Sequence, residues 1–308
     1  MWQLARLLHP PSSSARILGR RIFGVLQHKS YIDDSGVQDP KVCGLAGFVG
    51  TTLQMDRLDK RWKVILDKFE VPPEKGFHAD QFFHHKGFSE GWNTARWRAF
   101  LNHLLDAIYR SRVICIGGMV DVPYFSCLSE DERRWITGAF RGRQWDSEGS
   151  PSNPYFAAFH IAVTGVAKNV STGNKVTLIF DRQTQYENKA RMTYNDMLAF
   201  DIPEVSAKLD EDLIFSSRFS AVVLQAADLM AYQAYQHTVE RIENGGIEIP
   251  PNYVLKKLFR NKHSVIFINK DTVKVLLTDF HRLNPQGFRV KRGKKKKQFR
   301  IADKDKGV

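Results

Sequence analysis

The feature that most constrains the fold is an apolar run that ends in two adjacent carboxylates and is followed by a second apolar run. Tyr31-Ile32 leads into Asp33-Asp34, and Ser35-Gly36 then breaks the pattern. Residues 41–50 are almost entirely apolar. A short turn between two such runs predicts antiparallel strands, here over residues 29–34 and 41–50. Successive strand side chains point to opposite faces, so only one of the two acids faces any given helix.

Apolar strand-like runs and amphipathic helical patterns alternate along the rest of the chain. Periodicity predicts helices near residues 54–69, 94–110, 154–166, 187–198 and 221–242. It predicts buried strands near residues 113–121, 175–180 and 213–215. We expect an extended segment at 77–85, irregular structure at 123–153, a loop at 201–211, and a helix with an edge element in 252–280. Gly44 and Gly47 in the second strand permit close approach of another element.

This alternation after an opening hairpin predicts an α/β fold in which helices flank a mixed sheet. We expect one domain over residues 29–283, with extensions at both ends. Residues 1–28 are acid-free and contain Arg and Ser, which is typical of an organelle transit peptide. An ordinary disordered extension, or an upstream start codon, explains them as well, and we favour that interpretation.

The net charge of +13 belongs to the two ends of the chain. Residues 1–30 carry +5 and residues 285–308 carry +8, so the segment between them is formally neutral. A polybasic tail over 284–308 suits nucleic acid, through salt-sensitive attraction that is independent of sequence. We therefore predict Lys294, Lys295 and Lys296 as substrate contacts, although a solvated tail that aids solubility explains them equally well.

Three cysteines, Cys43, Cys115 and Cys127, form no CxxC pair. Such a sparse, odd number predicts a reducing compartment, and we expect a cytoplasmic protein. No uninterrupted apolar run approaches 18 residues, so we expect no membrane-spanning helix. The sequence leaves the oligomeric state open.

Three aspartates stand where a buried element would otherwise be uninterrupted. Asp33 ends the first strand, Asp181 ends the strand over 175–180, and Asp228 lies within the long helix over 221–242. Mg²⁺ or Mn²⁺ binds few carboxylates and fills its other positions with water and substrate phosphate. Two such ions activate water and stabilise the leaving oxygen in phosphodiester cleavage. We predict these three aspartates as catalytic metal ligands, with Asp34 either a fourth ligand or facing away.

Each candidate also has a purely structural explanation. Asp181 can cap the following helix, and Asp228 can pair with a nearby arginine. Asp121 ends a strand too, but it precedes Val122-Pro123, which is a turn signal. If the carboxylates of Asp33, Asp181 and Asp228 converge within metal-bridging distance in an open cleft, the enzyme hypothesis holds; if an arginine or lysine fills that point, it fails and a non-catalytic module is favoured.

Histidines gather in the segment His78, Asp80, His84 and His85. No cysteine stands nearby, and adjacent side chains of an extended segment point apart, so we do not expect zinc. We predict His78 as a proton carrier or substrate contact at the edge of the site. A structural histidine is the alternative.

In order and spacing, these residues resemble the DUF3800 family, whose members are grouped with ribonuclease H-like folds. The family's Asp-Glu-Ser-Gly strand end is similar to residues 33–36, and its Phe-His-Ala segment to residues 77–79. Its Gln-x-Ala-Asp-Leu helix motif is similar to residues 225–229, its helical tryptophan to Trp62, and its strand-terminal aspartate to Asp181. The resemblance covers residues 29–240 and departs at Asp34, where the family usually has glutamate.

The resemblance implies a ribonuclease H-like sheet with acidic residues at its centre. It implies a two-metal nuclease in which Asp33 and Asp228 hold Mg²⁺ or Mn²⁺, Asp181 completes the site, and a tail over 291–297 holds the phosphate backbone. Our first hypothesis is therefore a divalent-metal-dependent nuclease or phosphodiesterase. The alternatives are a non-catalytic nucleic-acid-binding or regulatory module, and a metal-dependent hydrolase of a small phosphorylated metabolite. The neutral core argues against a broad nucleic-acid groove and favours either binding assisted by the tail or a smaller substrate.

Overall fold

The computed structural model describes residues 26–137, 140–141, 144–145, 153–182, 184–200 and 203–283. Most of the N-terminal extension, and the tail with Lys294, Lys295 and Lys296, lie outside these residues. The described part is an α/β structure with a six-stranded mixed sheet flanked by helices, as the sequence predicts.

The sheet has the strand order β7-β6-β1-β2-β3-β8. Its strands are β1 (Gln27–Ser35), β2 (Val42–Thr51), β3 (Ile114–Asp121), β6 (Lys175–Asp181), β7 (Leu209–Ser216) and β8 (His263–Ile268). The predicted hairpin is confirmed, because β1 and β2 pair antiparallel. β6 lies parallel to β1 on its other side, so both strands end at the same edge of the sheet.

Glycines allow the central strands to pack as closely as they do. A Cβ added at Gly47 would lie 1.9 Å from the carbonyl oxygen of Tyr31 on β1, and one at Gly44 would lie 2.2 Å from Sδ of Met119 on β3. Both contacts are far below van der Waals separation. The expectation that these two glycines permit close approach is therefore confirmed.

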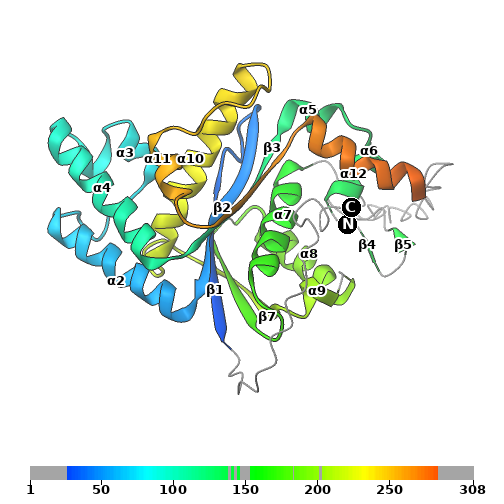
Figure 1. Cartoon of the computed structure of the whole chain (residues 1–308), viewed down its shortest axis with the longest axis horizontal. Helices are drawn as coiled ribbons and strands as arrows, with labels where there is room; N and C mark the ends of the chain where they lie inside the picture. Colours follow the sequence, from blue (N-terminus) through cyan, green and yellow to red (C-terminus); the bar gives the residue numbers. More distant parts are fainter. Residues whose placement is uncertain are drawn as a thin grey trace, which may run out of the picture.

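Helices cover both faces of the sheet (Figure 1). One layer contains α2 (Thr52–Lys68), α3 (Ala79–Phe83), η1 (Gly87–Ser89), α4 (Thr94–Ser111), α10 (Val223–Glu243) and α11 (Tyr253–Leu258). The other contains α5 (Val122–Cys127), α6 (Glu130–Ile136), α7 (Pro154–Asn169), α8 (Glu187–Phe200), α9 (Pro203–Ser206) and α12 (Lys270–Leu283). A small hairpin, β4 (Phe140–Arg141) with β5 (Gln144–Trp145), completes the described elements. Each layer has its own buried hydrophobic cluster against the sheet.

Helix α10 packs directly against the central hairpin. Its small residues Ala226, Ala227 and Ala231 are fully buried, which lets the helix lie close to β1 and β2. The chain turns between these strands at Gly36, whose φ of +68° favours glycine. This packing places the carboxylate of Asp228 on α10 beside the end of β1.

Three local predictions are wrong. Residues 77–85 contain helix α3 rather than an extended segment, because Ala79 and Phe82 bury one helical face. The interval 123–153 contains two helices, and Ser129 begins the second with a capping box. The loop predicted at 201–211 contains helix α9 and the start of β7. Among the helices that the structure describes, none has the length and hydropathy to cross a bilayer.

Candidate active site

Asp33 and Asp181 lie on neighbouring strands at the same edge of the sheet. Ile32 is paired with Phe180, so the next residue on each strand is one of these aspartates. The Asp33 side chain is buried, with the residue 4% exposed, and its Oδ1 accepts the backbone N–H of Asp34 at 2.8 Å. The sequence therefore correctly places two carboxylates side by side.

Asp228 joins them from helix α10. It is 6% exposed, and its Oδ2 accepts the backbone N–H of Ala79, the first residue of α3, at 2.8 Å. The N-cap residue of α3, His78, makes no capping hydrogen bond with its own side chain. Asp228 thus serves as a cap for α3 from another element, which explains how a five-residue helix is held at the site.

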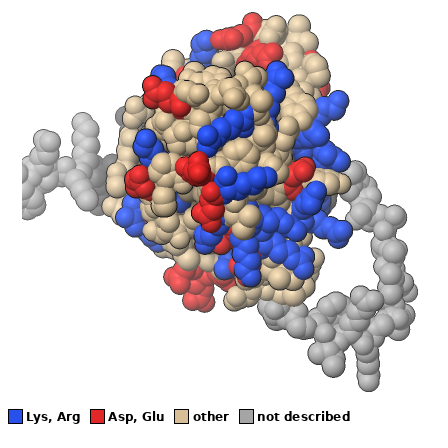
Figure 2. Space-filling view, turned by 90° about the vertical axis from the view of Figure 1, so that its left-hand side faces the viewer, with Lys and Arg blue, Asp and Glu red and all other residues tan. Residues whose placement is uncertain are grey.

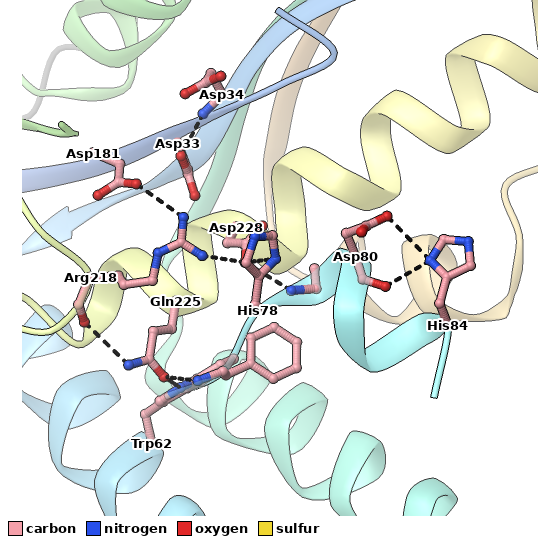
Figure 3. Close-up of polar contacts among 12 residues, drawn as sticks. Asp33, Asp34, Trp62, His78, Asp80, His84, Asp181, Arg218, Gln225 and Asp228 are labelled. Atoms are coloured by element: carbon pink, nitrogen blue, oxygen red, sulfur yellow. Dashed lines mark hydrogen bonds and ion pairs between the residues drawn. The ribbon is translucent and has the colours of Figure 1, made fainter. Parts of the chain in front are cut away.

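His78 lies at the edge of the site, as predicted. Its Nδ1 atom is 3.4 Å from Oδ2 of Asp228, and its side chain is 39% exposed. Residues Asp80 and His84 form a separate ion pair along α3, with Nδ1 and Oδ1 3.2 Å apart. That pair points away from Asp228 (Figure 3).

Arg218 lies between the carboxylates, and the sequence analysis did not single it out. It comes from the loop between β7 and α10, and its Nη2 donates to Oδ2 of Asp181 at 3.3 Å. Its Nη1 lies 3.5 Å from Oδ2 of Asp228. Figure 3 shows the carboxylates of Asp33 and Asp181 both directed toward this guanidinium. The structural explanation of Asp228, pairing with a nearby arginine, is confirmed.

Gln225 fixes the elements that carry these groups. Its Oε1 accepts the backbone N–H of Phe77 at 2.9 Å and the indole N–H of Trp62 at 3.3 Å. Its Nε2 donates to the carbonyl oxygen of Arg218 at 3.2 Å. This one buried amide therefore ties α10 to α2, to the segment before His78, and to the arginine loop.

The site carries an excess of negative charge. Burial raises the pKa of Asp33 well above its ordinary value, and the carboxylates of Asp228, Asp34 and Asp181 raise it further, while Arg218 lowers it. Burial also raises the pKa of Asp228, although His78 and Arg218 act in the opposite direction. One guanidinium does not neutralise this group of acids.

A cleft of about 450 Å³ opens over the carboxylates. Its lining includes Asp33, Asp34, His78, Arg218 and Asp228. Asp181 is not among the lining residues and instead holds Arg218 from behind. Of the predicted ligands, the structure thus brings Asp33, Asp34 and Asp228 to the cleft.

Two other acids, both at helix starts, have structural roles. Asp121 caps α5, where its Oδ1 accepts the N–H of Tyr124 at 2.9 Å. Glu187 pairs with Arg191 along α8. Both outcomes follow from their positions at helix starts.

Oxygen donors line the cleft, but Arg218 stands at the point where the carboxylates meet, which is the arrangement expected to argue against a metal-dependent enzyme. Within the described residues, no three Asp, Glu, His or Cys side chains are close enough to hold a metal ion together. Two buried nitrogens at the site, Arg218 Nη1 and His78 Nδ1, make no hydrogen bond among the described residues, although each lies within ion-pair distance of Oδ2 of Asp228. The site thus combines buried carboxylates with a guanidinium and an imidazole that both lie beside Asp228.

No protein-family model, curated protein or solved structure matches this chain.

Proposed function

We propose that this protein is a divalent-metal-dependent hydrolase of phosphoester bonds, with a ribonuclease H-like arrangement of the kind that the DUF3800 resemblance implies. The observation that carries the proposal is the meeting of buried acids in one cleft: Asp33 is 4% exposed and Asp228 is 6% exposed, and burial together with repulsion from the other acids raises the pKa of Asp33. A bound Mg²⁺ or Mn²⁺ would remove that repulsion and supply charge stabilisation and an activated water. One or two carboxylates are enough to hold Mg²⁺ when substrate phosphate completes its shell.

Asp33 and Asp228 are the proposed metal ligands, because both line the cleft and come from different rigid elements. Asp34, the next residue on β1, directs its side chain away from Asp33 and Asp228 (Figure 3), so it is not a proposed ligand. Asp181 holds the guanidinium of Arg218, and it becomes available as a ligand when that guanidinium turns away. Carboxylates supplied by a strand and a helix are positioned more tightly than loop residues would be.

Arg218 has two roles in this proposal. Without a divalent cation it balances part of the charge of Asp181 and Asp228. With substrate present, its free hydrogen-bonding capacity serves a phosphate oxygen, for which a guanidinium is well suited. The side chain is 22% exposed on a loop, which leaves it room to turn.

The reaction requires water to form a new P–O bond while the ester P–O bond breaks. The leaving alkoxide needs a proton, and the attacking water loses one. His78 is the proposed proton donor to the leaving oxygen, because its ring lies at the open edge of the cleft beside Asp228. Asp33 is the proposed group that orients the attacking water and accepts the proton that this water loses.

A second candidate function, a non-catalytic binding module, is favoured by the position of Arg218 between Asp181 and Asp228. In that case the guanidinium is a permanent counter-ion, and the cleft binds its ligand without a metal.

On the face of the molecule shown in Figure 2, Lys and Arg side chains gather toward one edge and are interrupted elsewhere by Asp and Glu. This distribution offers no continuous basic groove on the face shown.

The test is hydrolysis of labelled single- and double-stranded DNA and RNA and of a small phosphodiester, bis(p-nitrophenyl) phosphate. We expect turnover with Mg²⁺ or Mn²⁺, none with chelator, and a loss of about 100-fold or more in Asp33→Asn. Asp67→Asn, at an exposed position on α2, is the matched control. Binding without turnover in every metal would favour the module instead.

A further inference from the structure

A second hollow adjoins the carboxylate cleft along α10. It has a volume of about 420 Å³, and Tyr232 and Gln236 line both it and the cleft. From Asp228 to Val239 the helix rises by about 16 Å, since each residue adds about 1.5 Å. The two hollows therefore adjoin at Tyr232 and Gln236, and the second lies along α10 toward α11.

The walls of this second hollow differ from those of the carboxylate cleft. The rings of Phe83 and Tyr232 belong to its lining and stack on each other at a centroid distance of 5.2 Å and an angle of 10°. Val239 continues the apolar surface. Among the described residues, no Lys or Arg side chain belongs to this lining. Its polar groups are the amides of Gln233, Gln236 and Asn252 and the carboxylates of Glu240 and Glu243.

The amides are held in place. Asn252 Nδ2 donates to Oε1 of Gln233 at 3.1 Å, and the side chain of Gln236 hydrogen-bonds the hydroxyl of Tyr232. Gln233 is 3% exposed, so its orientation is fixed by packing. The amides of Gln236 and Asn252 are more exposed than that of Gln233, and with the neighbouring aromatic side chains they suit a nucleobase, because amides can donate and accept hydrogen bonds together.

We propose that the second hollow is a nucleoside subsite, so that the substrate is a nucleoside phosphate ester with its phosphate over Asp33 and Asp228. This inference rests on the proposed function for the position of the phosphate. The subsite begins next to the carboxylates and is about as long as one nucleoside. Glu240 and Glu243 lie at its far end, and although Glu243 pairs with Lys41 at 2.6 Å, Glu240 would repel a second phosphate there. A single nucleotide therefore fits better than a continuing backbone along this direction.

The test uses the full chain in chelator, with adenosine, guanosine, cytidine and uridine as probes and titration by NMR. These ligands carry no phosphate, so binding requires neither metal nor turnover. We expect at least one nucleoside to bind the wild-type protein and Asp33→Asn alike. Val239→Trp, which fills the hollow, should weaken that binding at least tenfold, whereas Val64→Trp on the exposed face of α2 should not. Gln236→Ala is a milder variant that should weaken it several-fold if Val239→Trp does not fold.

The outcomes separate this inference from the proposed function. Nucleoside binding that depends on Val239, in a protein that hydrolyses nothing, supports the subsite and contradicts the hydrolase. If the wild type hydrolyses nucleotide esters and p-nitrophenyl esters with the same KM, and Gln236→Ala changes neither KM, the subsite is contradicted. Absence of binding by all four nucleosides also overturns it.

Discussion

The Nη1 atom of Arg218 lies 3.5 Å from Oδ2 of Asp228, in the space where the sequence predicts a metal ion. The same guanidinium donates to Asp181, so one loop residue connects the end of β6 to helix α10. Asp33 nevertheless remains repelled by its neighbours. In our account, Arg218 is a partial counter-ion that a divalent cation and a phosphate replace.

Replacing Arg218 should therefore lower the free energy of unfolding of the metal-free protein and raise its affinity for metal. In chelator, Arg218→Gln should lower the free energy of unfolding by about 1–3 kcal/mol, less than for a fully buried ion pair because the side chain is partly exposed. Arg98→Gln, at an exposed site on α4, should change it by less than about 0.5 kcal/mol. Denaturant titration measures both. An Arg218→Gln protein that binds Mn²⁺ more weakly than wild type would contradict the counter-ion role.

Asp33→Asn should stabilise the metal-free protein at neutral pH. The pKa of Asp33 is raised in the folded state, so its favourable contribution is present below the unfolded pKa and is lost as pH rises through the folded pKa. The difference between variant and wild type should thus grow from acid toward neutral pH and reach about 1–2 kcal/mol. Unfolding curves in chelator from pH 3.5 to 8 test this. A difference that does not change with pH would rule the explanation out.

Gly47 should tolerate no side chain. Gly47→Ala places a Cβ against the backbone of Tyr31, so β1 and β2 must separate beside Asp33. We expect a loss of about 2–4 kcal/mol in unfolding free energy. Gly165→Ala is the matched control, because its nearest neighbour is 3.9 Å away and it lies inside α7, where alanine should stabilise by about 0.5–1 kcal/mol. Equal effects of the two substitutions would argue against the close strand approach.

Gln225→Leu should destabilise the protein by about 2–4 kcal/mol, because it leaves the buried N–H groups of Phe77 and Trp62 without their acceptor. Gln81→Leu, at an exposed position on α3, should have little effect. Thermal unfolding compares them, and tryptophan fluorescence should report the change at Trp62. Wild-type stability in Gln225→Leu would show that this amide does not hold the site together.

The strands and the carboxylates that end them could be predicted because strand sequences carry their burial locally. Asp33 and Asp181 each follow an apolar run, and parallel neighbours end at one edge. The helix over residues 79–83 could not be predicted, because its N-terminus is stabilised by Asp228, which is distant in sequence. Arg218 was missed for a related reason: it stands in a polar loop, and only the tertiary structure shows that it turns toward Asp181. The sequence did contain one signal for this contact: an arginine in the loop before a helix that bears a buried aspartate.

The central claim is that Asp33 and Asp228 hold a divalent cation. Calorimetric titration of Mn²⁺ into the metal-free wild type, Asp33→Asn, Asp228→Asn and the exposed control Asp67→Asn tests it most directly. We predict saturable binding to the wild type and Asp67→Asn, and at least tenfold weaker binding to the other two variants. Equal Mn²⁺ affinity in all four proteins, or no binding to the wild type, would contradict the claim.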